Sequence, residues 1–299
     1  MIWASRSLRT RLRRQFLLLG VAPVLAVFAA SWALLVPLLV QQAESRNREL
    51  ALAVSDQVRL QLEVRVRAAG VLAEALSADP RAVEAAQRAL PAMLAGDRFL
   101  QAAFVIDADS RVVAAALPPQ SGRFAEDATG LDLSGRAYVG ESRRRGGPVW
   151  SDTFLSTVGG EVTVALAVPA GQRMVLLELS LAELSKSVTD LAQASPVQVV
   201  IVDRSGHVVA HPDKGQALQQ VNLSNLPLVR AALAGTAGSA RAVQDGVDQL
   251  SHALPVAPIG WAVIVSQPVA AVMAPVVRLG GAVLGILACL LYTSPSPRD

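Results

Sequence analysis

Residues 200–211 read VIVDRSGHVVAH, and this segment closely repeats FVIDADSRVVAA at residues 104–115. In each, an apolar run leads to an aspartate, Asp203 or Asp107, then to a few mostly small or polar residues and a second apolar run. Short apolar runs separated by Asp, Ser and Gly indicate two buried strands joined by a tight turn. The chain is therefore expected to contain the same hairpin twice.

A second pair of segments repeats in the same order. Residues 164–179 (VALAVPAGQRMVLLEL) and 250–267 (LSHALPVAPIGWAVIVSQ) each contain an apolar run, a turn marked by Pro169 or Pro255, and another apolar run. Two units with the same order of antiparallel strands predict an α+β fold built as a tandem pair. The expected boundaries are 96–195 for the first unit, 196–268 for the second and 181–194 for a connecting helix.

The chain begins with a basic leader and a long apolar segment. Residues 1–15 carry only positive charges, at Arg6, Arg9, Arg11, Arg13 and Arg14. Residues 16–40 (FLLLGVAPVLAVFAASWALLVPLLV) contain no ionisable side chain, and about 25 such residues can cross a bilayer as a helix. The positive-inside rule keeps the leader in the cytoplasm and residues 41–275 outside. A cleaved signal peptide is the alternative, but its apolar part is usually about 7–15 residues long.

Residues 41–95 are expected to form a long helix that continues this span outward. Apolar residues recur along its first part about every 3.7 positions, which follows one face of a helix. They are Leu50, Val54, Val58, Leu62, Val66, Ala69, Leu72 and Leu76. This stripe can pack on its own domain or on a partner copy in a nearly straight pair, and the sequence leaves both open.

The end of the chain combines a second apolar segment with an abrupt change of composition. Residues 269–291 are expected to begin a second transmembrane helix. Residues 289–299, CLLYTSPSPRD, resemble the translation of a transposase sequencing adapter, which would make the second helix truncated after residue 288. A natural tail rich in Ser and Pro is the alternative.

The composition agrees with a folded domain anchored by membrane helices and not with a nucleic-acid-binding protein. Hydrophobic residues make up 52% of the chain and charged residues 17%, as expected when membrane helices are averaged with a folded domain. The net charge of +3 comes mostly from the leader, so no nucleic-acid surface is predicted. The single cysteine, Cys289, lies in the adapter-like tail, so the fold is expected to rest on its core without disulfides.

No residue pattern predicts catalysis, a metal or a cofactor. His207 and His211 have HxxxH spacing, but they flank a predicted strand, where residues four apart lie about 13 Å from each other. The only other histidine is His252, so no metal site is expected. Ser205 lacks the flanking residues of a nucleophile elbow. The arginines at 143–145 are expected to lie in a solvated loop, and Trp150 and Trp261 to belong to the core.

Several short motifs together resemble one family, the double Cache (dCache) sensor domain of bacterial transmembrane receptors. They are DLSGRAYV at 132–139, PVWSDT at 148–153, VDRSGHVVAHPD at 202–213 and PIGWAVIV at 258–265. The resemblance implies two PAS-like units, each with a central antiparallel sheet flanked by helices, and a ligand pocket in the membrane-distal first unit. It also implies a homodimer in the bacterial inner membrane, with residues 41–275 in the periplasm.

The resemblance implies a ligand site as well. Amino-acid-binding members carry an arginine and aromatic residues on the pocket helix, and here Arg136 and Tyr138 match while Val139 replaces the second aromatic residue. The late-strand acid of those members corresponds to Glu178, one methylene longer, and Asp152 is a further candidate or else stabilises a turn. An arginine can bind a ligand carboxylate through two hydrogen bonds, and an acid can bind an ammonium. The expected ligand is an amino acid or another organic acid; the alternative is that Arg136 is a solvated surface charge.

The expected function is extracytoplasmic small-molecule sensing by the input half of a membrane receptor. By resemblance, the output is a histidine kinase, with a chemoreceptor or a diguanylate cyclase as alternatives. A membrane-anchored binding or adaptor protein without an output domain is the alternative of another class. The sequence beyond residue 288 of the uninterrupted gene would distinguish these.

Overall fold

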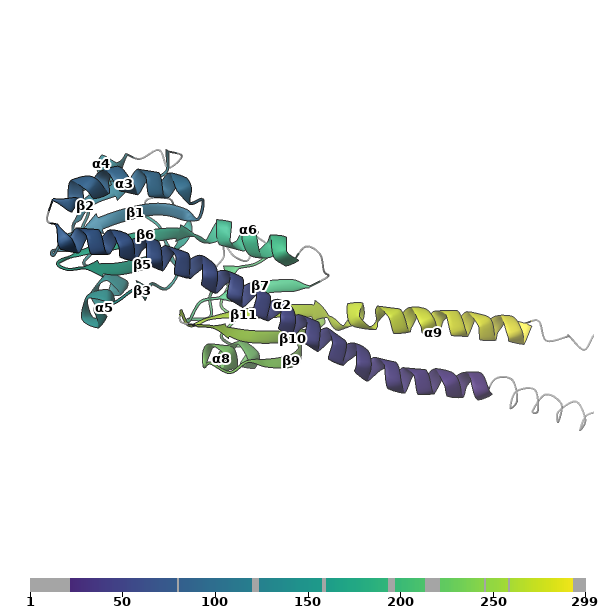
Figure 1. Cartoon of the computed structure of the whole chain (residues 1–299). Coiled ribbons are helices and arrows are strands. Elements are labelled where there is room, and N and C mark those ends of the chain that lie inside the picture. Colours follow the sequence, from purple (N-terminus) through teal and green to yellow (C-terminus); the bar gives the residue numbers. More distant parts are fainter. Residues whose placement is uncertain are drawn as a thin grey trace, which may run out of the picture. The chain divides into compact units, whose positions relative to one another are not determined.

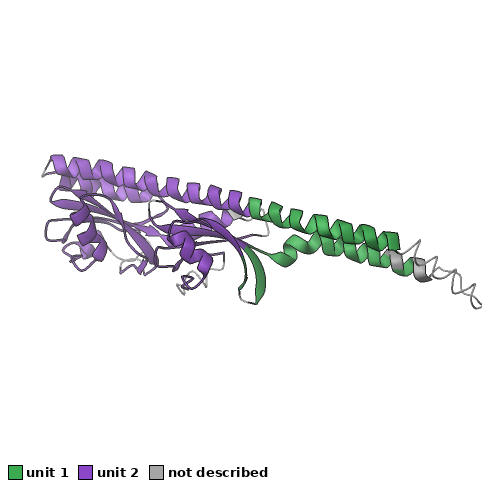
Figure 2. Ribbon diagram, turned by 90° about the horizontal axis from the view of Figure 1, so that it is seen from below, with its two compact units in different colours: residues 1–46, 241–250, 267–299 green, residues 47–240, 251–266 purple. Residues whose placement is uncertain are grey.

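The computed structural model describes residues 22–292 except 80, 120–123, 158–159, 193–196, 213–220, 245 and 258. The predicted leader, the first residues of the predicted span and residues 293–299 of the adapter-like tail lie outside the described residues. The chain divides into two compact units, coloured in Figure 2. Unit 1 comprises Met1–Arg46, Arg241–Leu250 and Gln267–Asp299, and unit 2 comprises Asn47–Ala240 and Ser251–Ser266.

The first described helix, α2 (Ala22–Ala78), contains most of the predicted span and continues beyond it without a break, although Pro37 lies inside it. The segment 41–95, predicted as one helix, is two helices in the structure, because α3 (Ala82–Gly96) follows separately. Asp79 precedes a proline in the sequence, and the residue before a proline avoids the helical region of backbone conformation. The proline therefore explains why α2 ends where it does.

The apolar stripe of α2 packs on the core of unit 2. Five of its members are fully buried in the main hydrophobic cluster: Val54, Val58, Leu62, Ala69 and Leu76. Leu50, Val66 and Leu72 are half-buried against the same cluster. Packing on its own domain is thus one role of the stripe, and packing on a partner copy stays a prediction.

The first sheet lies in unit 2 and has the strand order β2-β1-β6-β5-β3, with β4 also paired to β5 (Figure 1). All these pairs are antiparallel. The strands are β1 (Leu100–Ile106), β2 (Val112–Ala116), β3 (Val149–Trp150), β4 (Phe154–Leu155), β5 (Val162–Ala170) and β6 (Arg173–Ser180). The helices of this part are α4 (Ala125–Ala128) and α5 (Ala137–Arg145). The prediction of a loop at residues 143–145 is wrong, because these exposed arginines form the last turn of α5.

The second sheet repeats this order as β8-β7-β11-β10-β9, so each strand has a counterpart in the same place. Its strands are β7 (Gln198–Val202), β8 (Val208–Ala210), β9 (Gly238–Gln244), β10 (Val247–Val256) and β11 (Trp261–Pro268). The accompanying helices are α6 (Leu181–Ala192), α8 (Pro227–Leu233) and α9 (Val269–Tyr292). The predicted α+β fold with two repeated antiparallel sheets is confirmed, and α6 lies where the connecting helix was expected.

The repeated hairpins agree in atomic detail. Asp107 accepts hydrogen bonds from the backbone N–H groups of Asp109 and Arg111, both at 2.9 Å. Asp203 accepts the equivalent bonds from Ser205 and His207, also at 2.9 Å. The aspartate that the sequence repeat singles out therefore shapes the same turn in both sheets.

Helices cover the two faces of the first sheet differently, and the alternation along β1 shows how. Ala103 and Val105 belong to the cluster shared with α2, α3 and α6. Phe104 and Ile106 belong to a separate cluster that includes side chains of α4 and α5. Successive residues of a strand point to opposite faces, so α4 and α5 lie on the face away from α2. In the second sheet, α8 has the position that α5 has in the first, packed on the cluster of Val202 and Ile264.

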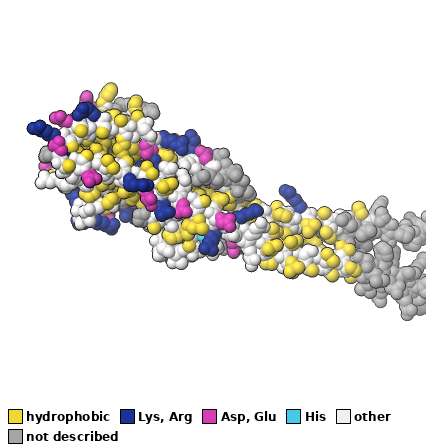
Figure 3. All heavy atoms as spheres, viewed as in Figure 1, with side chains coloured by type: hydrophobic (Ala, Val, Ile, Leu, Met, Phe, Trp, Pro, Cys, Tyr) yellow, Lys and Arg dark blue, Asp and Glu magenta, His cyan; other side chains and the backbone are white. Residues whose placement is uncertain are grey.

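Unit 1 has the surface expected of membrane helices. Among the described residues, α2 is the one helix long and apolar enough to cross a membrane, judged by length and composition. Val269–Gly285 of α9 is apolar but shorter, so the second transmembrane helix stays a prediction. Figure 3 shows hydrophobic side chains over much of the viewed face of these helices. They include Val27, Leu34 and Leu38 of α2 and Leu284 of α9, all more than half exposed.

Candidate functional site

Helix α5 brings two of the predicted residues onto the first sheet. Arg136 is the residue that caps its start, and Tyr138 lies in its first turn. Ser142 in the same helix donates a hydrogen bond to the carbonyl oxygen of Gly147 at 2.9 Å and lies 3.3 Å from that of Ala167 in β5. The buried hydroxyl of Ser142 therefore anchors α5 to the sheet and sets the height of Arg136 and Tyr138 above it.

Glu178 reaches the same face from the centre of the sheet. It lies in β6, is 7% exposed, and pairs across the strands with Ala102 of β1 and Ala165 of β5. The small neighbours leave the carboxylate without apolar cover from the adjacent strands. Ser156 donates a hydrogen bond to Glu178 Oε2 at 2.7 Å. Burial raises the pKa of Glu178, while this hydrogen bond and the charge of Arg136 oppose the rise.

An aromatic residue joins Arg136 and Tyr138. The ring of Phe154 in β4 lies 5.0 Å from the guanidinium carbon of Arg136 and is stacked on Tyr138, with centroids 6.0 Å apart. Burial raises the pKa of Tyr138, the charge of Glu178 adds to the rise, and Arg136 opposes it. Tyr138 is therefore a neutral phenol at physiological pH, and Arg136 is held by a cation–π contact.

A cavity of about 270 Å³ opens beside Arg136. Its lining combines that arginine with Asp127, Asp132 and Thr157 and with apolar side chains of α4 and the following turn. A backbone hydrogen bond from Ser134 lowers the pKa of Asp132, so this carboxylate is ionised. The volume is close to the lower end of small-molecule pockets, roughly 300 Å³. A compact metabolite fits this cavity better than an extended one.

Asp152 takes part in different contacts. Its side chain is 58% exposed, and its carboxylate accepts a hydrogen bond from Arg204 Nε at 2.5 Å. Arg204 belongs to the turn of the second sheet, between β7 and β8. The ring of Phe154 thus joins Arg136 and Tyr138, and Glu178 interacts electrostatically with both. Asp152 has other contacts.

The sequence did not point to Phe154, Ser156 or Thr157 as site residues. Phe154 and Ser156 follow Asp152 at alternate positions, which is the spacing of side chains on one face of an extended chain. That alternation was the available signal. It is weak because β4 itself is only Phe154–Leu155.

The three histidines and the carboxylates of the described residues form no group of three or more metal-ligating side chains. The ring of His207 contacts Asn222 Nδ2 at 3.3 Å, and that of His211 contacts Gln198 Nε2 at 3.0 Å. These two rings therefore each have an amide neighbour, and the ring of His252 contacts the hydroxyl of Ser239 at 2.9 Å.

Comparison with known proteins identifies one family. The family model described as Cache domain matches residues 37–276, which covers both sheets and most of the long helix. No curated protein matches the sequence.

Solved structures with the same fold include extracellular and ligand-binding domains of receptors. The extracellular domain of rpHK1S-Z16, a protein described as a histidine kinase, aligns with a TM-score of 0.65 and 15% identity over 76% of this chain and 95% of its own. The ligand-binding domain of the Pseudomonas aeruginosa amino acid chemoreceptor PctB with L-arginine gives 0.58 and 20%, over 76% of this chain and 96% of its own. That of the Pseudomonas fluorescens chemoreceptor CtaA with L-leucine gives 0.58 and 16%, over 78% and 97%. At these identities the likeness establishes the fold.

Proposed function

Because this chain belongs to the Cache domain family, we propose that it is the extracytoplasmic sensor part of a bacterial membrane receptor. The membrane helix and the family match are the supporting observations, since Cache domains resemble the ligand-binding domains of chemoreceptors and histidine kinases. The residues from 41 to 275 are proposed to lie in the periplasm and the anchor in the inner membrane.

The proposed ligand is an amino acid or a small organic acid, bound on the first sheet. The observation that carries this proposal is that Arg136 lines the cavity and acts electrostatically on the buried Glu178, which lies on the same face of the sheet but not in the cavity lining. No hydrogen bond joins the Arg136 guanidinium to any other described residue, so its planar donors remain available for a carboxylate. Glu178 is a buried acid whose ionised form gains from a ligand ammonium. The amino acid ligands of PctB and CtaA support the same class.

The proposed output is a histidine kinase domain. The fold is shared with domains of both a histidine kinase and chemoreceptors, which supports ligand sensing in general. The test is the uninterrupted gene: a linker helix followed by a phosphoacceptor histidine and an ATP-binding domain supports the kinase. A chemoreceptor or cyclase sequence there would replace it, and a stop codon would favour the adaptor class.

The proposed receptor acts as a homodimer. In unit 2, α2 exposes Leu60, Val64 and Val71 on the side that does not pack on the core, each about half exposed or more. Apolar side chains in a row on one helix favour a partner helix over water. Val64→Cys in a Cys289→Ser background should form a disulfide-linked dimer in membranes, and a monomer at every position tested along this row would contradict the proposal.

A ligand screen tests the binding site. The full chain in detergent micelles is heated in the presence of single L-amino acids, dicarboxylates and other small carboxylates. A ligand at about 100 times its dissociation constant adds about 2.7 kcal/mol of stability, which a melting curve detects. Arg136→Ala should remove the shift. Leu226→Ala is the matched control, because Leu226 caps α8 in the second sheet as Arg136 caps α5 in the first. A shift that Arg136→Ala leaves intact would contradict the site.

The topology has its own test. Alkaline phosphatase fused near residue 215 should be active, because the enzyme folds outside the cytoplasm. An inactive fusion that is well expressed would contradict the receptor proposal.

A further inference from the structure

One edge of the first sheet contains a β-bulge. Trp150 of β3 pairs with Leu166 of β5, and Phe154 of β4 pairs with Thr163. Four steps along the edge thus oppose three steps along β5, so the edge has one extra residue. Ser151 closes the gap. Its backbone N–H donates to Ala165 O, and its side-chain Oγ accepts from the Ala165 N–H, both at 2.8 Å. A bulge bends the strand and re-aims the neighbouring side chains.

The re-aimed side chains contact the hairpin turn of the second sheet. Thr153 donates its hydroxyl to Asp203 Oδ2 at 2.9 Å. Arg204 donates to the carboxylate of Asp152 at 2.5 Å and to the carbonyl oxygen of Trp150 at 2.8 Å. Asp203 is fully buried, and its other oxygen holds the turn itself. One carboxylate therefore shapes the turn of the second sheet and binds the edge of the first.

The same edge continues directly into the candidate ligand site. Phe154, the residue after Thr153, supports Arg136 and stacks on Tyr138. Ser156, two residues further, donates to Glu178. Residues 150–156, here named the coupling segment, thus contact the second sheet at one end and the site at the other.

We propose that the coupling segment transmits changes at the Arg136–Glu178 site to the Asp203–Gly206 turn of the second sheet. Phe154 and Thr153 are adjacent in an extended chain, so a displacement of the Phe154 ring moves the backbone that places the Thr153 hydroxyl. A carboxylate on Arg136 would compete with the face of Phe154, and an ammonium on Glu178 with the hydroxyl of Ser156. The ligand would then bind the two states of the segment differently, which is the condition for a population shift. This last step rests on the proposed function, whereas the coupling itself does not.

The test perturbs the site without any ligand and measures the turn. The full chain in nanodiscs is compared by hydrogen–deuterium exchange as wild type and as Phe154→Ala, with Phe154→Leu as a milder variant. Exchange of the amides in 203–211 should rise about threefold or more, within the range of coupling that mutations between linked sites produce. Thr153→Val removes the hydroxyl that binds Asp203, so adding Phe154→Ala to it should cause little further rise.

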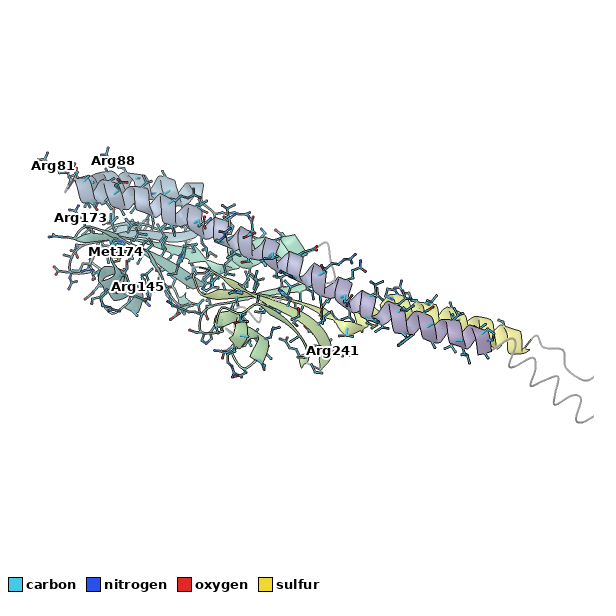
Figure 4. The ribbon with its side chains drawn as sticks, turned by 60° about the horizontal axis from the view of Figure 1, so that its bottom comes forward. Arg81, Arg88, Arg145, Arg173, Met174 and Arg241 are labelled. Atoms are coloured by element: carbon cyan, nitrogen blue, oxygen red, sulfur yellow. The ribbon has the colours of Figure 1, made fainter. Side chains whose placement is uncertain are left out.

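The matched control is Met174→Ala. Met174 is fully buried in the same cluster as Phe154, but it pairs with Pro169 at the other end of β5 (Figure 4). It loosens the first sheet without touching the coupling segment and should leave exchange in 203–211 as in wild type. The coupling would be overturned if the amides of 203–211 exchanged in Phe154→Ala as slowly as in wild type, or if Met174→Ala raised their exchange as much as Phe154→Ala. Either result leaves the ligand screen unaffected, so this failure is distinguishable from a failure of the proposed function.

Discussion

The two sheets place different side chains at equivalent positions. Asp132 forms an isolated β-bridge with Arg111 in the first sheet, and Asn222 forms one with His207 in the second. These equivalent bridges align the segments that lead into α5 and α8. Four and six residues later, Arg136 and Tyr138 are replaced by Leu226 and Leu228.

The buried acid is replaced as well. Glu178 pairs with Ala102, five residues before Asp107, and Ser266 pairs with Gln198, five residues before Asp203. The position of Glu178 is therefore Ser266 in the second sheet. Its hydroxyl lies 2.8 Å from that of Ser251, so its polar group is satisfied within the protein.

This difference distinguishes the proposed site from the second copy of the same fold. The same backbone arrangement occurs in both sheets. At these equivalent positions, however, only the first sheet has charged side chains, Arg136 and Glu178. Function thus depends on the side chains placed on a fold and not on the fold itself. The second sheet instead contacts the first through Asp203 and Arg204, which is the arrangement that the proposed coupling requires.

The largest contrast is expected where β6 and β11 begin. Trp261 in β11 is 1% exposed. Its counterpart in β6 is the half-buried Arg173. The two correspond because the residues that follow them, Ala262 and Met174, pair with equivalent residues of β7 and β1. Trp261→Ala should lower the free energy of unfolding by about 3–5 kcal/mol through the cavity it leaves. Arg173→Ala should cost about 1 kcal/mol or less. Denaturant unfolding in micelles measures both, and equal losses would show that the closing strands are not used differently.

The next contrast concerns the two hairpin aspartates. Asp203 is buried and accepts three hydrogen bonds, from Ser205, His207 and Thr153. Asp107 is half-buried and accepts the two bonds of its own turn. Hydrogen bonds to a charged group contribute about 1.5–3 kcal/mol each when buried and less near water.

Asp203→Ala is therefore expected to cost about 3 kcal/mol and Asp107→Ala about half of that. Arg143 further limits the second loss, because it donates to the carbonyl oxygens of Asp107 and Ala108 and steadies the turn without the carboxylate. The measurement is the free energy of unfolding of each variant. A greater loss for Asp107→Ala would refute the idea that the second turn is tied to the first sheet.

A smaller, pH-dependent contrast is expected between Glu178 and Ser266. Burial raises the pKa of Glu178 above its ordinary value of 4.5, so the native state holds its proton more tightly than the unfolded state. As the pH rises from the ordinary value through the raised one, the unfolded state ionises first and the stability of the protein falls. Glu178→Gln should remove this part of the pH dependence, and Ser266→Ala should not change it. Melting temperatures across this pH window provide the test, and parallel curves for wild type and Glu178→Gln would exclude a buried, proton-binding Glu178.

The sequence alone predicted the repeated hairpins, both closing strand pairs and the grouping of Arg136, Tyr138 and Glu178 as candidates. The hairpins and strand pairs follow from local signals, since Asp-turn chemistry and apolar runs are visible residue by residue. The three candidate residues came from the resemblance to dCache domains and stay a prediction. It did not predict Phe154 and Ser156 or the contact of Asp152 with Arg204. These depend on a bulge that appears only when β4 pairs with β5, and on contacts with Glu178 and Arg204, which lie 22 and 52 residues away from their partners. Contacts at such separations leave little trace in one sequence.

The smallest expected effect is that of metal removal, and it again compares the two copies. The HxxxH pair of the second hairpin, His207 and His211, corresponds to Arg111 and Ala115 in the first. The first hairpin therefore lacks the two histidines, and any metal site of this kind would distinguish the second sheet from the first. The two residues flank β8, where the extended chain separates them by about 13 Å, beyond the reach of a single ion. Incubation with a chelator and a reductant should therefore leave the melting temperature of the full chain unchanged, and His207→Ala should melt identically with and without added zinc. A fall of several degrees in the chelator, absent in His207→Ala, would show that the second sheet is a metal site, and the two copies would then differ in their chemistry in a second way.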